Sequence, residues 1–139
     1  MPAKDKYHDA IKAALIHDGW KITHDPFYLR LGRRKGYIDL GAEKQLIGAE
    51  KGNRKIAVEI KSFIGLSSVK DFQEALGQFL LYKPALSKKA PARTLFLALP
   101  EEFFDSFFDD PYFLEVAELY EMKMIIVDII KKEIITWKK

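Results

Sequence analysis

Residues 55–63 read Lys-Ile-Ala-Val-Glu-Ile-Lys-Ser-Phe, and this stretch decides the predicted fold. Its apolar residues alternate with others, and a period of two is typical of a β-strand. The alternation places Glu59 and Lys61 together on one face, opposite the face of Val58. An amphipathic helical pattern follows, which predicts a central strand, and central strands rarely keep charged residues for solvation alone. Glu59 and Lys61 are therefore candidate functional residues, although a cross-strand ion pair is the commoner meaning of such a pattern.

Periodicity divides the rest of the chain into further elements. Apolar residues at helical spacing predict helices, and apolar runs bounded by turn residues predict strands. Gly52-Asn53 is typical of a tight hairpin turn. Ser67 or Ser68 can cap a helix, and Pro84 stands where that helix is expected to end. The expected elements are a helix over Asp5–Asp18, strand pieces at Trp20–Thr23 and Phe27–Leu31 around an Asp25-Pro26 turn, a β-rich hairpin region from Gly36 to Phe63, a helix with Val69, Phe72, Leu76, Phe79 and Leu80 on one face, a buried strand at Ala92–Leu99, one or two helices in 101–122 broken near Pro111, and strands at Met124–Ile130 and Ile134–Trp137.

This order is helix, three strands, helix, strand, an acidic helical segment and two C-terminal strands, which predicts a mixed sheet of the α/β (α+β) class. The 139 residues form one expected domain, 1–139, with 48% apolar residues. The absence of cysteine excludes a disulfide scaffold, a Cys-ligated metal and a thiol nucleophile, and it fits the cytoplasm, where we expect the protein. No apolar run approaches the roughly 20 residues of a membrane helix, so we expect no membrane span.

The formal net charge of +3 is unevenly distributed along the chain. Residues 1–98 contain 18 Lys and Arg against 10 Asp and Glu, a net charge of +8, whereas residues 99–139 contain 5 against 10, a net charge of −5. Clustered cations suit a phosphate backbone, so we expect DNA contact in the first segment, although a solvated lysine-rich surface gives the same balance. The densest basic run is the expected DNA-binding loop and consists of Arg33, Arg34 and Lys35, with Arg30 close by.

Asp39 lies among apolar β-forming residues in 36–40, which is unusual for a plain strand. Two carboxylates on neighbouring strands can share a Mg²⁺ or Mn²⁺ ion, and a nearby lysine can hold a water and stabilise charge on a phosphate. We therefore expect Asp39 and Glu59 as metal ligands and Lys61 as the third catalytic residue. Gln78 and Tyr82 lie one turn apart on the predicted helix, as accessory residues that could meet a phosphate or orient the lysine. A polar boundary stripe is the alternative for that pair.

Asp39, Glu59-Ile60-Lys61 and a helix carrying Gln78-Phe79-Leu80-Leu81-Tyr82 together resemble the PD-(D/E)XK nuclease superfamily. The signature of that superfamily is an Asp, a Glu-x-Lys and, in its RecB-like branch, a Gln-x-x-x-Tyr. The resemblance implies a restriction-endonuclease-like core and a Mg²⁺-dependent endonuclease of this type, and leaves open whether this chain is active. Many of these nucleases carry a helix-borne acid where this chain has His8, a further accessory candidate. A lone histidine at such a place is more often a packed boundary residue.

Longer stretches resemble the cyanobacterial XisH family, the fdxN element excision controlling factors. They include residues 19–26, 37–43, 49–51 and 55–63, and the resemblance runs over nearly the whole chain. It implies an accessory protein for programmed, site-specific DNA excision, acting beside a site-specific recombinase and a companion protein called XisI. Cleavage is not implied by itself, so the alternative is a non-catalytic regulator that binds an XisI-type partner and DNA with a nuclease-derived fold. A homo-oligomer is left open.

The predicted hairpin turn conflicts with a shared metal site. A regular turn pairs Glu59 with Leu46, and Asp39 then lies seven residues further along the strand. At about 3.3 Å per residue, an unbent strand would place Asp39 roughly 23 Å from that level, too far to share an ion. If the chain does not fold back before Leu46, the alternative second acid is Glu43 or Glu50.

The acidic C-terminal segment is rich in phenylalanine. Phe103-Phe104 and Phe107-Phe108 recur four apart, and Phe113 follows. One Phe of each pair can enter a core, but exposing both partners would make an apolar patch, so we expect a protein interface here, at Phe104 and Phe108. A helix buried on two sides, with these residues in the core, is the alternative.

Overall fold

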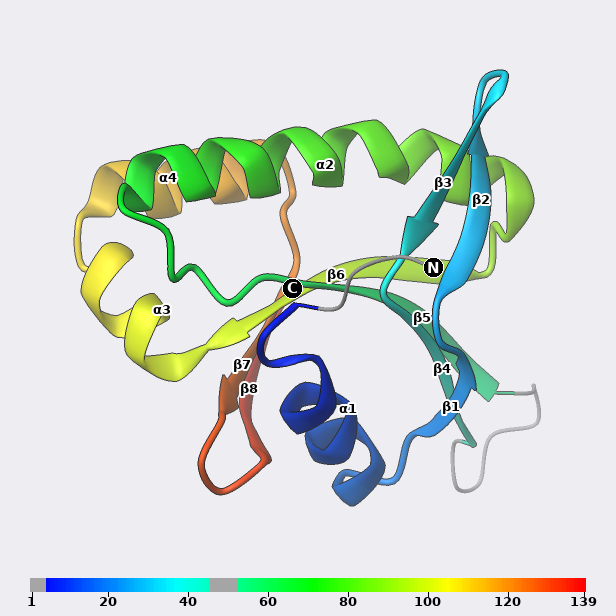
Figure 1. Cartoon of the computed structure of the whole chain (residues 1–139), viewed down its shortest axis with the longest axis horizontal. Helices are drawn as coiled ribbons and strands as arrows, with labels where there is room; N and C mark the ends of the chain where they lie inside the picture. The colour runs from blue at the N-terminus through cyan, green and yellow to red at the C-terminus, as the bar shows by residue number, and fades with distance from the viewer. Residues whose placement is uncertain (1–4, 46–52) are drawn as a thin grey trace.

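The computed structural model describes residues 5–45 and 53–139. A mixed six-stranded sheet in the order β1-β4-β5-β6-β7-β8 forms its centre, and β2 and β3 form a separate two-stranded sheet (Figure 1). The predicted α/β (α+β) class is confirmed. The elements are α1 (His8–His17), β1 (Lys21–His24), β2 (Phe27–Leu31), β3 (Arg34–Ile38), β4 (Leu40–Gln45), β5 (Asn53–Ile60), α2 (Ser68–Lys89), β6 (Arg93–Pro100), α3 (Glu101–Phe107), α4 (Pro111–Leu119), β7 (Met124–Asp128) and β8 (Glu133–Lys138).

Strand β5 lies in the middle of the large sheet, as its sequence pattern predicts. It pairs antiparallel with β4 and parallel with β6, and β6 pairs parallel with β7. Its apolar residues Ile56, Val58 and Ile60 are buried. The buried strand predicted at Ala92–Leu99 is also present, as β6, in which every residue from 95 to 100 is buried.

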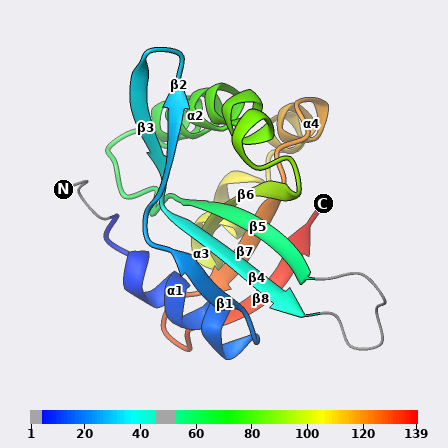
Figure 2. The same ribbon diagram turned by 90° about the vertical axis from the view of Figure 1, so that its right-hand side faces the viewer.

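Both faces of the large sheet are covered. The helices α2, α3 and α4 and the β2–β3 hairpin cover one face, and α1 covers the other (Figures 1 and 2). Leu97 of β6 belongs to the core on the first side together with Phe79, and its neighbour Phe96 belongs to the core on the second side together with Leu15. Because successive residues of β6 enter different cores, this strand is apolar throughout.

Five strands precede α2, so the prediction of three is wrong. The two pieces around Asp25-Pro26 belong to different sheets, because β1 pairs with β4 whereas β2 pairs with β3. Leu31 pairs with Arg34, and the turn between them contains Gly32 in the left-handed region with φ of 64°. Such a two-residue turn returns the chain at once beside β2 and produces a hairpin that stands apart from the large sheet (Figure 2).

The register of β4 against β5 also differs from the prediction. Gln45 pairs with Asn53 and Leu40 pairs with Val58, while residues 46–52, including Gly52 of the predicted turn, lie outside the described residues. The pairing of Glu59 with Leu46 is therefore wrong by seven residues. Asp39 directly precedes Leu40, so it lies at the level of Glu59, and the two carboxylates meet without any bend in β4.

Helix α2 is longer than predicted. Ser67 caps it by accepting a hydrogen bond from the backbone N–H of Lys70 at 3.3 Å, as expected. It does not end at Pro84 but continues to Lys89, and Leu86 beyond the proline is buried in the core. Packing of this last part therefore outweighs the backbone hydrogen bond that proline removes. The core face consists of Phe72, Ala75, Phe79 and Leu86, whereas Val69 and Leu80 are exposed, contrary to the prediction.

None of the described helices combines the length and the apolar character that crossing a membrane requires.

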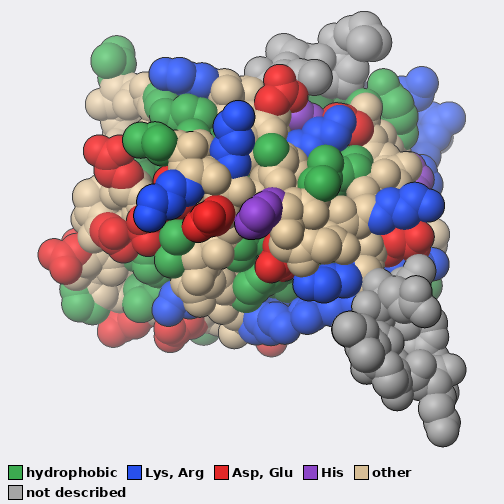
Figure 3. Space-filling model, turned by 90° about the horizontal axis from the view of Figure 1, so that it is seen from below, with side chains coloured by type: hydrophobic (Ala, Val, Ile, Leu, Met, Phe, Trp, Pro, Cys, Tyr) green, Lys and Arg blue, Asp and Glu red, His purple; other side chains and the backbone are tan. Residues whose placement is uncertain are grey.

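The acidic segment forms two helices separated near Pro111, as predicted. Asp110 caps α4 by accepting a hydrogen bond from the backbone N–H of Tyr112 at 3.0 Å. The phenylalanine rings pack on one another and on Phe72, with Phe108 buried to 6% exposure and Phe104 half-buried, so the expected exposure of both rings is wrong, while the protein interface itself stays a prediction. Carboxylates remain prominent along the left edge of the face in Figure 3, the side on which α3 and α4 lie in Figure 1.

The aromatic cluster predicts a large difference between two neighbouring aromatic substitutions. Phe108→Ala removes a buried ring that contacts Phe72 and should lower the free energy of unfolding by about 3 kcal/mol. Tyr112→Ala, at a residue 63% exposed, should lower it by about 1 kcal/mol or less. Urea denaturation followed by circular dichroism measures both. Equal losses would contradict the placement of Phe108 in the core.

Candidate functional site

Asp39 and Glu59 meet on the face of the sheet that α2 covers. Asp39 occupies the bend between β3 and β4, and Glu59 lies one residue before the end of β5. Their side chains are almost withdrawn from solvent, at 7% and 5% exposure. The backbone N–H of Ile60 donates a buried hydrogen bond to Asp39 Oδ2 at 2.7 Å. This bond holds the bend against the end of β5.

The electrostatics of this pair are unfavourable for two ionised acids. Burial, together with hydrogen bonding to Asp39 and repulsion by its charge, raises the pKa of Glu59 from 4.5 to about 10. The Lys61 ammonium lowers this pKa but does not offset the other effects. Glu59 is consequently protonated at neutral pH when no cation is bound, and a strongly perturbed carboxyl in a cavity is typical of a functional site.

A cavity of ≈ 190 Å³ opens beside the two carboxylates. Its lining includes all five residues that the sequence motifs single out, since Lys61, Gln78 and Tyr82 join Asp39 and Glu59 there. The remaining lining residues are Asp5, Tyr37 and Ile60. Residues from four separate segments of the chain therefore present carboxylate, ammonium, amide and phenol groups to one small space.

The groups opposite the carboxylates come from β5 and α2. Lys61 follows β5, and its backbone N–H donates to the carbonyl of Ala98 at 3.0 Å, which continues the pairing with β6. Burial raises the pKa of the Tyr82 phenol, and the nearby Glu59 charge adds to this effect. Gln78 Oε1 is buried and has no hydrogen-bond partner among the described residues. A buried amide oxygen without a donor indicates a place for a ligand or a water.

Two lining residues were missed from the sequence. Tyr37 lies two residues before Asp39 on the same chain, so strand alternation could have placed it on the same face. Asp5 gives no such signal, because its position depends on long-range contact. Its carboxylate accepts hydrogen bonds from the backbone N–H groups of Tyr7 and Ser62, both at 3.0 Å, and the second bond fixes it beside the end of β5.

His8 does not line the cavity, so its proposed accessory place there is wrong. It is buried, and its Nε2 lies 2.8 Å from Oδ1 of Asp25, whose other oxygen, Oδ2, accepts a hydrogen bond from Lys12 at 2.7 Å. Helix α1 begins at His8 rather than at Asp5. His8 therefore points toward the β1–β2 connection, whereas Asp5, which precedes the helix, lines the cavity.

Glu43, one of the two alternative second acids, does not line the cavity. Glu43 pairs in register with Lys55, four residues along the chain from Asp39, or about 13 Å in a strand. Glu50 lies outside the described residues. Of the proposed acids that the structure describes, Asp39 is therefore the one that accompanies Glu59.

The donor set suits a hard cation that retains water. Among residues 5–45 and 53–139, no group of three or more His, Cys, Asp or Glu side chains could hold a metal ion alone. Mg²⁺ usually binds through one or two protein carboxylates and keeps several waters. Asp39 and Glu59 fit this requirement, and the buried oxygen of Gln78 faces the same cavity. A zinc site, which needs three or four protein ligands, does not fit these residues.

The predicted DNA-binding residues lie on the β2–β3 hairpin and are all exposed. Arg30 and Lys35 are register partners, and Arg33 and Arg34 occupy the turn end of the hairpin. Figure 1 shows that this end protrudes from the molecule. The basic run therefore lies at the end of β3 away from Asp39 rather than directly beside the carboxylates.

Comparisons with known proteins extend over almost the whole chain. The family model described as XisH protein matches residues 1–135. The crystal structure of an XisH family protein from Nostoc punctiforme is 36% identical, with a TM-score of 0.87 over 97% of this chain and 100% of that one. A fdxN element excision controlling factor protein from Anabaena variabilis is 35% identical, with a TM-score of 0.85 over 96% and 98% of the two chains. No curated protein matches the chain.

The carboxylate pair predicts a pH dependence of stability. Because folding raises the pKa of Glu59, its stabilising contribution is complete below about pH 4.5 and is lost as the pH rises toward 10. One such group changes stability by at most about 1.4 kcal/mol per pH unit. Between pH 6 and 9 in EDTA, wild type should lose roughly 2 kcal/mol or more relative to Glu59→Gln, measured by urea denaturation.

The matched control for this measurement is Glu115→Gln, at an exposed position of α4. Its stability should follow that of wild type across the whole pH range. A Glu59→Gln curve parallel to wild type would show that folding leaves the pKa of this carboxyl unchanged.

Proposed function

Because the chain belongs to the XisH family, we propose that it controls the excision of a DNA element and acts on the DNA itself. Support for excision control comes from the similar Anabaena variabilis protein, which is described as an fdxN element excision controlling factor. Support for a chemical role comes from a single observation, the convergence of Asp39, Glu59 and Lys61 in one cavity.

The finer proposal is a Mg²⁺-dependent phosphodiesterase site of the PD-(D/E)XK type. Asp39 and Glu59 would hold the ion, Lys61 would act on the phosphate, and Gln78 and Tyr82 complete the RecB-like pattern in the same cavity. A bound Mg²⁺ would activate a water and stabilise negative charge on the phosphate. Asp5 is a third carboxylate on the lining, and it stands near the start of α1, where the pattern of these nucleases has an acid.

The protein groups have separate tasks in this proposal. The Lys61 ammonium carries a fixed positive charge close to Glu59, where it can stabilise charge that develops on a phosphate oxygen. The unpartnered amide oxygen of Gln78 can accept a hydrogen bond from a water or from the lysine. Asp39 is held in one orientation by the N–H of Ile60, so only one of its oxygens is engaged by the backbone.

DNA and protein partners belong to the proposal as well. The exposed Arg33 and Arg34 at the hairpin end would contact the phosphate backbone. An XisI-type companion and a site-specific recombinase are the proposed protein partners. A non-catalytic regulator is the alternative, and it is favoured by one observation, the division of the chain into a basic segment, 1–98, with a net charge of +8 and an acidic segment, 99–139, with a net charge of −5.

Cleavage assays on duplex, branched and single-stranded DNA with Mg²⁺ test the catalytic proposal. Asp39→Asn, Glu59→Gln and Lys61→Ala should each reduce the cleavage rate by roughly 100-fold or more, because each removes a metal ligand or the charge that stabilises the phosphate. Both carboxylate substitutions keep an acceptor oxygen and the side-chain volume. Lys131→Ala, an exposed residue of the β7–β8 turn, should cut at the wild-type rate.

If the protein is a non-catalytic regulator, the same set of variants should give a different result. It would bind DNA equally in all variants and cut in none of them, wild type included. Mn²⁺ soaked into crystals provides a direct check, since the catalytic proposal requires one ion in contact with both Asp39 and Glu59. An ion that contacts neither would contradict the proposed site.

A further inference from the structure

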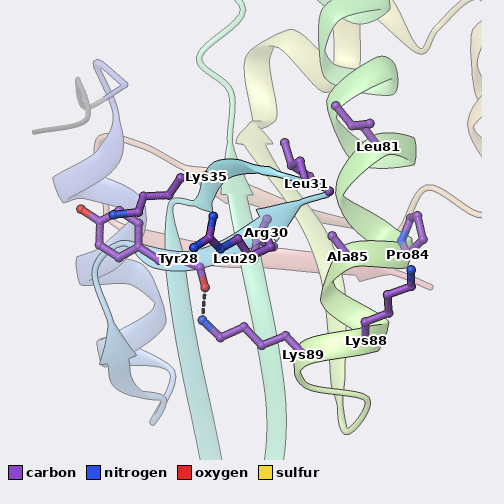
Figure 4. Close-up of a pocket in the computed structure, with 11 residues that line it drawn as sticks. Tyr28, Leu29, Arg30, Leu31, Lys35, Leu81, Pro84, Ala85, Lys88 and Lys89 are labelled. Carbon is purple, nitrogen blue, oxygen red and sulfur yellow. Dashed lines mark hydrogen bonds between the residues drawn. The ribbon is translucent and has the colours of Figure 1, made fainter.

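The two faces of the β2–β3 hairpin are unlike. Burial alternates along β2, where Phe27 and Leu29 are buried whereas Tyr28 and Arg30 are exposed. The buried residues belong to the core, and this inner face meets the C-terminal half of α2 across a cavity of ≈ 660 Å³ (Figure 4). Lys89 of α2 donates a hydrogen bond to the backbone carbonyl of Tyr28 and ties the hairpin to the helix. The opposite face of the hairpin therefore points away from α2.

Two register pairs form this outer face, namely Tyr28 with Tyr37 and Arg30 with Lys35. They share one face because they lie two positions apart along the strands. Figure 4 shows the Tyr28 ring and the Lys35 side chain together on the side away from α2, and the Lys35 ammonium lies 5.7 Å from the ring centre. Arg30 Nη1 donates to the carbonyl of Arg33 at 3.5 Å, a long bond that a stronger acceptor can replace.

The charged side chains of the hairpin are all positive. Residues 27–38 contain four Lys or Arg and no Asp or Glu. All four cations are exposed, and the end of the hairpin that carries Arg33 and Arg34 protrudes from the molecule (Figure 1). A polyanion can therefore approach the outer face and the turn without meeting a carboxylate of the hairpin.

The shape of the hairpin suits a groove of duplex DNA. Its two strands form a sheet of their own, with a spacing of about 4.8 Å that is usual for paired strands. A two-stranded ribbon fits the major groove of B-DNA, which is about 12 Å wide, whereas the minor groove is only about 6 Å wide. With the outer face toward the base edges, Arg30 and Lys35 can donate to O6 and N7 of guanine. The turn then lies beside the phosphates.

The outer face has a fixed position relative to the carboxylates. Strand β3 leads directly to Asp39 through Ile38, which is fully buried. Tyr37 of the outer face also lines the carboxylate cavity, so the two surfaces are continuous. Lys35 lies four residues before Asp39, which corresponds to about 13 Å along a strand, or to about four base pairs of DNA.

We propose that the outer face of the β2–β3 hairpin lies in the major groove of duplex DNA, where Arg30 and Lys35 contact base edges about four base pairs from the phosphate at the carboxylate site. The inference rests on the proposed function in taking DNA as the ligand. It goes further because it makes the hairpin the element that reads the sequence. It also separates the two base-reading residues from Arg33 and Arg34, which contact phosphates.

Selection from a library of duplexes with a random central segment tests this reading. The full-length protein is used in EDTA, so that no DNA is cut. Wild type should enrich a short motif that contains guanine, and it should bind a selected duplex at least about tenfold more tightly than a scrambled one. Replacing the guanines by 7-deazaguanine, which lacks the N7 acceptor in the major groove, should remove most of this preference. Netropsin, which occupies the minor groove, should leave it unchanged.

Substitutions separate base contacts from phosphate contacts. Arg30→Ala should reduce the discrimination between the selected and the scrambled duplex about tenfold, and Lys35→Ala provides a second test at a neighbouring base pair. Arg34→Ala should weaken binding to both duplexes equally and reduce the slope of log affinity against log salt by about 0.9. Lys131→Ala removes an equal charge from an exposed turn and should bind both duplexes as wild type does. Thermal melts identify any variant that is unfolded.

Three results would overturn the inference. These are the absence of an enriched motif, a preference that 7-deazaguanine leaves intact, and equal losses of preference in Arg30→Ala and Lys131→Ala. Cleavage distinguishes this failure from failure of the proposed function. Cutting that depends on Glu59 but shows no sequence preference would reject only the groove contact, whereas a motif that depends on Arg30 without cutting would reject only the catalytic site.

Discussion

The buried hydrogen bond from the N–H of Ile60 to Asp39 Oδ2, at 2.7 Å, is the contact on which the candidate site depends. It joins the bend between β3 and β4 to the last residue of β5, two places 21 residues apart in the chain. A carboxylate 7% exposed needs such a donor, because burying an unpaired charge costs several kcal/mol. The same bond that satisfies Asp39 therefore also fixes its position beside Glu59.

The packing of the surrounding fold keeps Asp39 and Glu59 together although the burial of two carboxyl groups at one place is electrostatically unfavourable. Burial disfavours the charged form of a carboxyl group, and two carboxyl groups buried together also repel one another when both are ionised; the rise in the pKa of Glu59 reflects both effects. The surrounding sheet is rigid because β5 is paired on both sides and covered on both faces. Arg93 adds a clamp between β4 and β5, since its guanidinium donates to the carbonyls of Ala42 at 3.2 Å and Ile56 at 2.7 Å.

The β2–β3 hairpin is the part of the structure that relates the carboxylates to the basic surface. It is a separate sheet packed on α2, and one of its register pairs, Tyr28 and Tyr37, contributes to two neighbouring cavities. The smaller cavity, of ≈ 190 Å³, is lined by the carboxyl groups of Asp5, Asp39 and Glu59. The larger cavity, of ≈ 660 Å³, is lined by lysine, arginine and apolar residues of the hairpin and α2.

The amino-acid sequence by itself determined the central strand, its Glu59 and Lys61 face, the two helices of the acidic segment and the buried β6, because alternation and periodicity are local properties. Asp39, Gln78 and Tyr82 were also found from their residue types and order. Tertiary structure alone decided the register of β4 against β5, since Asn53, which the sequence placed in a two-residue turn, pairs with Gln45 of β4. It also extended α2 beyond Pro84, buried Phe108, paired His8 with Asp25 and brought Asp5 to the cavity. Each of these depends on contacts between residues distant in the chain, and no local pattern records which distant residue a side chain will meet.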